Sequence, residues 1–473
     1  MRSTLRKWCV ACALSCLILS ACAPPIETYA TPQTELPAGK HESEDWSKWW
    51  ECFKDPALTA LVEEALKNNP DILLAAAKLE QSRGSLRLAQ SNLFPSIFAN
   101  AGGNRHQISV DGNIPPAPGQ QRLSTVYTAN LSASYEVDFW GKLAAQRKGA
   151  QESLKASLYA QEMTRTVVAA QVARSYFTLR ALDRDLDVLE KTLATRDKAV
   201  GLQKKRLDAG LIGAYEYALA EAERNAAAAI LPGVRTAVEQ AEISLSVILG
   251  RSPRALVEEK VARGAGADVL SKIPPVPGGL TSDLLMRRPD VIAAEHMLHA
   301  VHASVNEARA KWFPSIILSG VLGGESVSLH NLLTGPASTW TLASALAQPI
   351  SGLWTVNAQI KYAKAVRGES EVIYQQVVRR AYADVLTALS VHKGSAQTLI
   401  KSEKLFENQD KVKSLAQRQF EVGKISRIAL LDAERERFAA ERALVAAQRD
   451  RALALVSVYQ ALGGGWDVGE KTP

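Results

Sequence analysis

The chain has 473 residues, of which 47% are hydrophobic and 22% are charged, and its formal net charge is +7. This composition excludes a disordered tail and a fibrous repeat, and the lack of any run of 18 uncharged apolar residues excludes a bundle of membrane-spanning helices. Taken alone, it is typical of a large soluble protein with about three domains at about 150 residues per domain.

The N-terminus has the features of an export signal. A basic start precedes an apolar stretch at residues 8–19, which is too short to span a bilayer but suits the core of a signal peptide. Leu-Ser-Ala-Cys follows at 19–22 and resembles the lipobox of bacterial lipoproteins. We predict a lipoprotein signal peptide at 1–21 and, as the only added groups, diacylglycerol and fatty acyl chains such as palmitate on Cys22. An ordinary secretory signal with a chance cysteine is the alternative.

Removal of the signal changes the cysteine content and the charge. Of the five cysteines, three leave with residues 1–21 and Cys22 is acylated, so only Cys52 remains and no intrachain disulfide is possible. Residues 1–21 also carry three basic groups and no acidic group, so their loss lowers the net charge from +7 to +4. The basic character therefore does not indicate a nucleic-acid partner. Alanine at position 23, where aspartate would favour retention in the inner membrane, favours the outer membrane.

The rest of the chain is an internal duplication. Pro-Asp at 70–71 recurs at 289–290, and Phe-Pro-Ser-Ile at 94–97 recurs at 313–316, in both cases 219 residues further along. Further matches, such as a Leu-Gly pair near the end of each half, follow in the same order at an offset of 213 residues. Ordered matches at nearly constant offsets indicate two copies of one unit.

The duplication defines the expected organisation. We predict a lipidated N-terminal segment at 22–56, a first repeat at 57–250, a linker or equatorial segment at 251–279, a second repeat at 280–464 and a C-terminal tail at 465–473. The linker is rich in proline and glycine, which is typical of an extended connection.

Each repeat begins with a helix and two strands. Residues 70–93 have helical periodicity, and residues 126–138 alternate between apolar and polar side chains, which predicts a strand between two different environments. Residues 96–105 form a weaker partner strand, and 316–323 and 340–348 are the corresponding strands of the second repeat. Strands of about 9–13 residues have the length that a tilted transmembrane β-strand needs.

Two long helices complete each repeat. An apolar position recurs every three or four residues over 168–207, with three polar interruptions, as in a left-handed coiled coil. We predict a helix at 142–208, roughly 100 Å long at 1.5 Å per residue, then a turn at Gly210 and an alanine-rich helix that returns. The second repeat predicts a helix at 355–421, a turn at Gly423 and a second returning helix.

The number of strands predicts an oligomer. Four strands are too few to close a barrel, and open strand edges in lipid leave backbone groups unpaired at a cost of several kcal/mol each. Two chains would supply eight strands around a filled interior, whereas three would supply twelve with room for a pore. A soluble dimeric coiled-coil protein with a small β-domain is the rival interpretation, because a half-buried soluble strand alternates too.

Four motifs then carry a family resemblance. They are Trp-Ser-Lys-Trp-Trp-Glu at 46–51, Tyr-Glu-Val-Asp-Phe-Trp-Gly-Lys at 135–142, Leu-Thr-Ser-Asp-Leu-Leu-Met-Arg-Arg-Pro-Asp at 280–290 and Ala-Leu-Gly-Gly-Gly-Trp at 461–466. Together they resemble the outer-membrane factor lipoproteins of the NodT/OprM type, within the TolC superfamily. The resemblance implies an α+β membrane protein, in which four β-strands per chain enter a trimeric 12-stranded outer-membrane barrel and long coiled-coil helices form a periplasmic α-barrel.

The resemblance also implies a function. Such proteins are passive outer-membrane channels of tripartite efflux systems, which export drugs and other small toxic compounds and contribute to multidrug resistance. The implied partners are two further copies of the chain, a periplasmic adaptor (membrane fusion protein), an inner-membrane pump of the RND type and outer-membrane lipid. The implied location is the Gram-negative outer membrane, with a lipid anchor and an extension into the periplasm. A conduit for type I protein secretion and a structural envelope coiled-coil protein without a channel are the alternatives.

Site residues follow from the resemblance only where residues match. In the family, the turns between the long and the returning helices form periplasmic tips that dock the adaptor. The matching residues are Arg206, Leu207, Gly210, Leu211, Phe420, Gly423 and Lys424. Plain hairpin turns, in which glycine only supplies a positive φ, are the simpler interpretation, and both interpretations are compatible.

Two acids are candidates for a gate. Glu216 and Asp432 match positions where the family tends to place acids near the closed aperture, and three copies of an acid would form a negative ring that favours cations. A solvated helix face is the alternative for both. The sequence departs from the family at Ala429, the repeat mate of Glu216, and at the turn at 351–354, so the gate chemistry is less well defined.

Catalysis is not expected. Residues 22–473 contain no Gly-x-Ser-x-Gly, His-Glu-x-x-His, P-loop or Cys-x-x-Cys motif, and the Cys-x-x-Cys at 9–12 lies in the predicted signal peptide, so we predict that the protein is not an enzyme. His296, His299 and His302 lie near Glu295 on one predicted helical stripe and could bind a metal. A solvated helix face is the simpler interpretation, and we assign no metal site.

Overall fold

The computed structural model describes residues 48–111, 117, 119, 121–264, 270, 287–348 and 350–464. The predicted signal peptide, Cys22 and the C-terminal tail lie outside these residues, as does part of the predicted linker. The described residues fall into two compact units. The first contains residues 79–157 and 294–374, and the second contains residues 48–78, 158–293 and 375–464.

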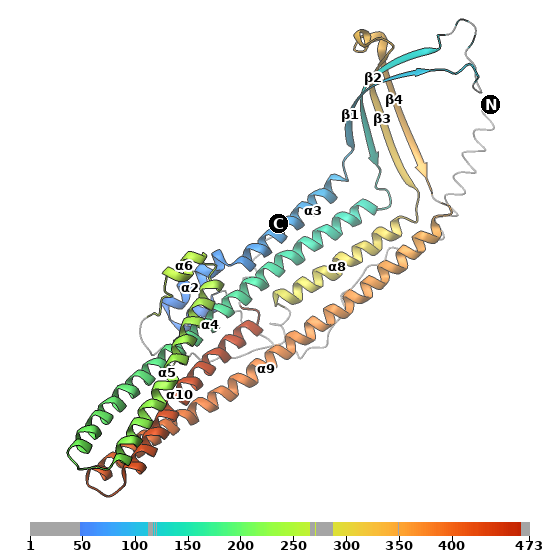
Figure 1. Cartoon of the computed structure of the whole chain (residues 1–473). Helices are drawn as coiled ribbons and strands as arrows, with labels where there is room; N and C mark the ends of the chain where they lie inside the picture. Colours follow the sequence, from blue (N-terminus) through green and yellow to red (C-terminus); the bar gives the residue numbers. More distant parts are fainter. Residues whose placement is uncertain are drawn as a thin grey trace. The chain divides into compact units, whose positions relative to one another are not determined.

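Most of the described chain is helical (Figure 1). The helices are α2 (Pro56–Asn68), α3 (Pro70–Ser91), α4 (Lys142–Asp208), α5 (Ala214–Ile248), α6 (Pro253–Glu258), α8 (Pro289–Ala310), α9 (Leu353–Glu421) and α10 (Arg427–Ala461), with the 3₁₀ helices η1 (Trp49–Phe53), η3 (Leu329–Asn331) and η4 (Gly335–Ala337). The long helices predicted at 142–208 and 355–421 are confirmed. α5 continues through Pro232, although proline removes one backbone donor from a helix.

Among the described residues, none of the helices is long and apolar enough to cross a membrane.

The strands form one antiparallel sheet in the order β1 (Ser96–Gln107), β2 (Leu123–Glu136), β3 (Ser315–Ser326) and β4 (Ser338–Ala347). The four predicted strands are confirmed to within three residues at each end. β2 ends before Asp138 because the carboxylate of Asp138 accepts hydrogen bonds from the backbone N–H groups of Leu143 (3.0 Å) and Ala144 (2.7 Å) and so begins α4. The β2–β3 pairing joins the two repeats within the sheet.

The two faces of this sheet differ in polarity. Leu131 lies opposite Leu322, and Leu322 lies opposite Trp340, so the three side chains share one face. The register also places the following side chains on this apolar face: Ile97, Ala99, Ala101, Tyr127, Ala129, Ala133, Tyr135, Ile316, Leu318, Leu342 and Leu346. Leu322 is 63% exposed and Trp340 is 77% exposed in the single chain. An apolar surface of this kind requires an apolar neighbour, either another protein or lipid.

The core of the second unit is an aromatic cluster that holds the N-terminal segment. Trp49 stacks on Tyr459 of α10, with ring centroids 5.3 Å apart, and Phe53 contacts Phe177 of α4 at 4.7 Å. The buried carboxylate of Asp55 accepts a hydrogen bond of 2.5 Å from the hydroxyl of Tyr176. Residues that precede the first repeat thus contact helices from both repeats.

The duplication is visible in equivalent contacts. Asn69 Nδ2 donates to the carbonyl oxygen of Ile248 (2.7 Å), and Arg288 Nη1 donates to the carbonyl oxygen of Ala461 (2.6 Å). The donors are 219 residues apart and the acceptors 213, which are the two offsets of the sequence repeat. Each bond ties the start of a repeat to its last helix, and the predicted internal duplication is therefore confirmed.

Gly250 combines a positive φ with a close backbone neighbour. It has a φ of +74°, and a Cβ atom there would lie 2.2 Å from the carbonyl oxygen of Asn68. We expect Gly250→Ala to lower the free energy of unfolding by about 2–4 kcal/mol, because positive φ and overpacking each add a cost. Gly210→Ala is the matched control, since Gly210 has a φ of +70° but no heavy atom near the new Cβ. Thermal unfolding followed by circular dichroism measures both, and equal midpoints would contradict the contact argument.

Candidate functional site

Four of the residues predicted for a docking tip lie in the last turn of α4 and in the connection from α4 to α5. Gly210 adopts a φ of +70°, and its backbone N–H donates to the carbonyl of Leu207 at 2.8 Å. The N–H of Leu211 donates to the carbonyl of Arg206, also at 2.8 Å. These two bonds satisfy carbonyl groups at the end of α4, as in other glycine-terminated helices. The glycine is therefore required by the turn itself, and Leu211 is left 70% exposed.

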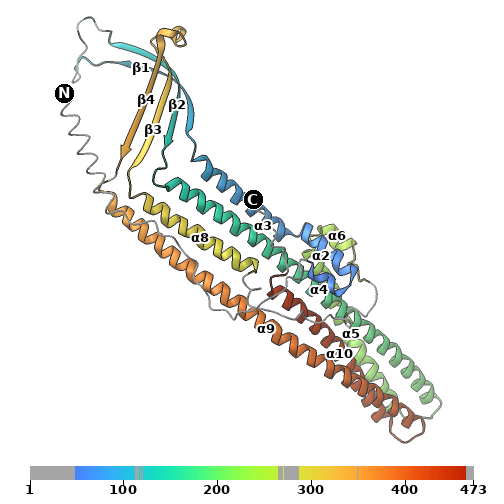
Figure 2. The same cartoon turned by 180° about the vertical axis from the view of Figure 1, so that it is seen from behind.

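The turn between α9 and α10 repeats this geometry. Gly423 has a φ of +72°, and its N–H donates to the carbonyl of Phe420 at 2.9 Å, while the N–H of Lys424 donates back into the last turn of α9 at 2.8 Å. Arg427 lies over the ring of Phe420 at 5.6 Å. Both turns lie at the same end of the second unit (Figures 1 and 2), so the predicted tip residues occupy one surface.

An ion-pair network centred on a buried acid lies a few turns along these helices. Glu223 of α5 is only 9% exposed, and its carboxylate contacts Arg196 of α4 (3.4 Å) and Arg435 of α10 (2.8 Å). Arg196 also donates to the carbonyl oxygen of Glu223 at 2.5 Å. The hydrogen bond to Glu223 raises the pKa of Arg435 above its ordinary value. One carboxylate therefore links helices from both repeats.

The two gate candidates have different surroundings. Asp432 accepts a hydrogen bond of 3.0 Å from Arg435 and so joins the Glu223 network. Glu216 is exposed in the first turn of α5, where the positive end of the helix dipole favours an acid. Asp432 is thus connected to the Glu223 network, which joins helices of the two repeats, whereas Glu216 lies on the exposed first turn of α5.

Sequence reasoning missed the centre of this network. The sequence alone does not point to Glu223, although Arg196 is one of the three polar interruptions of the apolar seam. A cation in such a seam requires a buried partner, and the returning helix is the nearest source of an acid. That signal could have pointed to Glu223.

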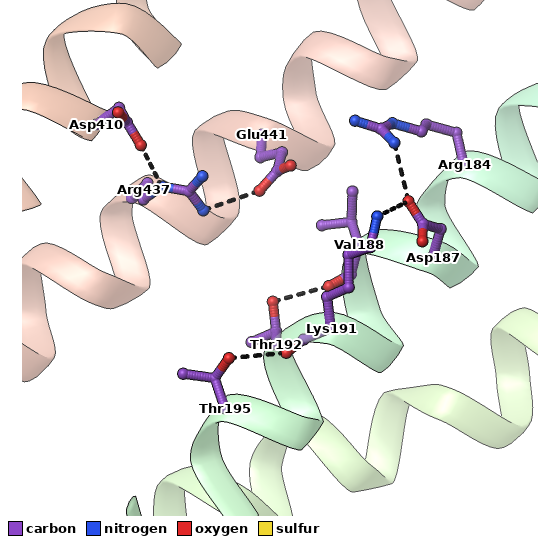
Figure 3. Close-up of polar contacts among 9 residues, drawn as sticks. All are labelled: Arg184, Asp187, Val188, Lys191, Thr192, Thr195, Asp410, Arg437 and Glu441. Atoms are coloured by element: carbon purple, nitrogen blue, oxygen red, sulfur yellow. Dashed lines mark hydrogen bonds and ion pairs between the residues drawn. The ribbon is translucent and has the colours of Figure 1, made fainter. Parts of the chain in front are cut away.

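Further ion pairs hold the helical hairpins together (Figure 3). Arg437 of α10 contacts Asp410 of α9 at 2.6 Å and Glu441 of its own helix at 2.9 Å. On α4, Asp187 accepts from Arg184 and from Lys191, each at 2.8 Å. The Arg437–Asp410 ion pair joins α10 to α9, whereas the contacts of Asp187 stay within α4 and support that helix only locally.

The histidines of α8 contact neighbouring side chains. His296 Nδ1 lies 2.7 Å from Glu152 Oε2 of α4, and His302 is only 8% exposed and contacts Asn306. The interpretation of the three histidines as a solvated face is therefore wrong for His302, because that side of α8 is packed. Among the described residues, no group of three or more histidine, cysteine or acidic side chains gathers as metal ligands.

Comparison with known proteins identifies the family. The family model described as "Outer membrane efflux protein" matches residues 61–251 and 280–464, and the chain belongs to this family. It is a family of efflux proteins, and the resemblance read from the four motifs is confirmed.

Relatives and a solved structure agree with this assignment. The chain is 29% identical to the probable efflux pump outer membrane protein TtgC of Pseudomonas putida, over 98% of this chain and 96% of the relative. It is 28% identical to the probable outer membrane lipoprotein SilC of Salmonella typhimurium, over 94% and 93% of the two chains. It also superposes on the open state of the Neisseria gonorrhoeae MtrE outer membrane channel with a TM-score of 0.81 and 28% identity, covering 94% of this chain and 98% of that chain. The predicted outer-membrane location is thereby confirmed.

A double-mutant cycle tests whether Glu223 and Arg435 form a link. We expect Arg435→Gln and Glu223→Gln each to destabilise the protein, with a coupling energy of about 1 kcal/mol because the two groups share one contact. Chemical unfolding of the single and double variants gives this energy. Arg449→Gln is the matched control, since Arg449 lies on the same helix and pairs with its neighbour Asp450 at 2.8 Å. Additive effects in the Glu223–Arg435 cycle would show that the pair contributes no coupling.

Proposed function

We propose that the protein is the outer-membrane channel of a tripartite efflux system, a passive conduit for drugs or other small toxic compounds. The observation that carries this proposal is the sheet, which has one apolar face, one polar face and two unshared edges. Within the described residues, β1 and β4 each pair on one side only. Since unpaired strand edges are costly in lipid, the edges of one chain would pair with those of further copies.

Three copies account for the sheet best. Twelve strands would place the apolar face toward lipid and leave a lumen lined by the polar face. That face carries asparagine and hydroxyl side chains, and Asn100 Nδ2 donates to Asn130 Oδ1 (3.2 Å) and to Ser132 Oγ (3.0 Å). A lining of amides and hydroxyl groups suits an aqueous path. MtrE, on whose structure this chain superposes, is described as an outer membrane channel, which supports the proposal.

The two turns of the second unit are the proposed docking surface for a periplasmic adaptor. Leu211 and Lys424 present an exposed apolar group and an exposed cation at the same end of the helices. An inner-membrane pump, of the RND type, would act through this adaptor. The description of the relative TtgC as a probable efflux pump outer membrane protein supports such an assembly.

Bilayer recording tests the channel. We expect the purified full-length trimer to conduct ions in a planar bilayer, and Asp432→Asn to lower the ratio of cation to anion permeability several-fold, because in the proposed trimer three acids would form a ring at a narrow point. Asp450→Asn, a change of an exposed acid on the same helix, is expected to leave this ratio unchanged. A protein that never conducts would favour the structural coiled-coil alternative.

Gene deletion separates the two transport alternatives. Loss of the channel is expected to increase the accumulation of dyes and antibiotics in the cell, with an unchanged set of secreted proteins. Normal accumulation together with a missing secreted protein would instead indicate a conduit for type I secretion.

Lipidation of Cys22 is the second part of the proposal, supported by the lipobox and by the description of SilC as a probable lipoprotein. We expect Cys22→Ser to abolish the incorporation of labelled palmitate. Cys52→Ser is the control, because Cys52 is the free cysteine of the described chain and burial raises the pKa of its thiol to about 11, which leaves it protonated at neutral pH. Label that persists in Cys22→Ser and disappears in Cys52→Ser would overturn this assignment.

A further inference from the structure

A cavity of about 380 Å³ lies between the first turns of α4 and the last turn of α8, within the first unit. Its walls include the aromatic rings of Trp140 and Phe313 and the side chains of Arg147, Lys148 and Arg309.

The cavity is positively charged. Arg309 is 3% exposed, so its guanidinium is held within the protein, whereas Arg147 and Lys148 are exposed at the opening. The acid in the wall, Glu152, is contacted by His296 at 2.7 Å and by Lys155 at 3.3 Å. Hydrogen bonding from His296 and the charge of Lys155 outweigh burial and lower the pKa of Glu152. The cavity wall therefore contains three cations and one carboxylate, and that carboxylate already contacts His296 and Lys155.

The cavity opens on the side of the apolar face of the sheet. Glu136 continues the polar face of β2, and Lys142 of α4 contacts it at 2.6 Å. At 3.6 residues per turn, Arg147 and Gln151 lie about 140° and about 180° around α4 from Lys142. Because Lys142 points toward the polar side, the cavity lies toward the apolar side.

Aromatic side chains mark the level at which the apolar face ends. Trp140 stacks on Phe313 with ring centroids 4.4 Å apart, and its Nε1 donates to the carbonyl of Pro314 at 2.8 Å. Phe139 lies against Trp140 and is 70% exposed. Aromatic rings concentrate where the hydrocarbon of a bilayer meets its headgroups. Arg147 and Lys148 lie just beyond this level along α4, and Arg309 lies in the last turn of α8.

We infer that this cavity binds the phosphate group of an anionic phospholipid from the periplasmic leaflet of the outer membrane. The inference rests on the proposed placement of the sheet in that membrane. The acyl chains would lie along the apolar face near Tyr135 and Ile316, and the phosphate would contact Arg309 from within and Arg147 and Lys148 from the opening. Basic pockets at the membrane surface are typical sites for anionic headgroups.

Native mass spectrometry of the purified full-length trimer, titrated with phosphatidylglycerol or phosphatidylethanolamine, tests the site. Wild-type protein is expected to retain phosphatidylglycerol preferentially. The double change Arg147→Gln/Lys148→Gln is expected to weaken this retention at least about tenfold, since each cation near an anionic surface contributes about 1 kcal/mol. Lys361→Gln/Lys364→Gln is the matched control, because it removes two exposed cations of α9 that do not line the cavity.

The outcomes separate the possible occupants. Equal weakening by both double changes, or equal retention of phosphatidylethanolamine, would overturn the site. Displacement of the lipid by excess inorganic phosphate alone would show a small-anion site and would also overturn it. Arg309→Lys keeps the charge and, with circular dichroism as the check on folding, is expected to weaken retention less than the double change at the opening. Conductance is recorded on the same preparations, so a failure of the channel proposal is visible separately from a loss of lipid retention.

Discussion

The backbone groups along the outer edges of β1 and β4 constrain this protein more than any single side chain does. In water these groups would bond to solvent, but the apolar face beside them, on which Trp340 and Leu322 are exposed, suits the placement in lipid proposed above. An unpaired N–H or C=O group there would cost several kcal/mol, so in that placement the sheet would be complete only when other chains supply its neighbours. On this proposal the single chain is one part of a larger assembly.

The helices satisfy a different constraint, because their backbone groups are already paired within each helix. What must be fixed is how one hairpin lies against the next, and buried polar contacts do this. Glu223 accepts from Arg196 and Arg435 and so specifies which turns of α4, α5 and α10 meet. A purely apolar seam would allow slippage by a heptad, whereas a buried acid with two cations has one register.

The sequence predicted the elements well because their signals are local. Alternation over β2 and the heptad seam of α4 depend only on which face is apolar, and the predicted ends of α4 agree with the structure. Asp138 illustrates the limit of such local signals. The alternation over 126–138 predicts that Asp138 belongs to the strand, but its carboxylate caps α4 instead. The Glu223 network and the cavity beside Arg309 could not be predicted, because each combines residues far apart in sequence whose proximity depends on tertiary register.

The two repeats also show where a duplicated chain is free to change. The turns at Gly210 and Gly423 and the bonds that close each repeat keep the same backbone geometry, because a positive φ or a helix-end carbonyl requires it. The side chains that make those bonds have diverged. Asn69 closes the first repeat as a neutral amide, whereas Arg288 closes the second as a cation that also contacts Asp290 and Asp384. The two repeats thus keep the same backbone geometry but differ in the charge of the side chains that close them, which lets two copies of one unit occupy unequal positions in one chain.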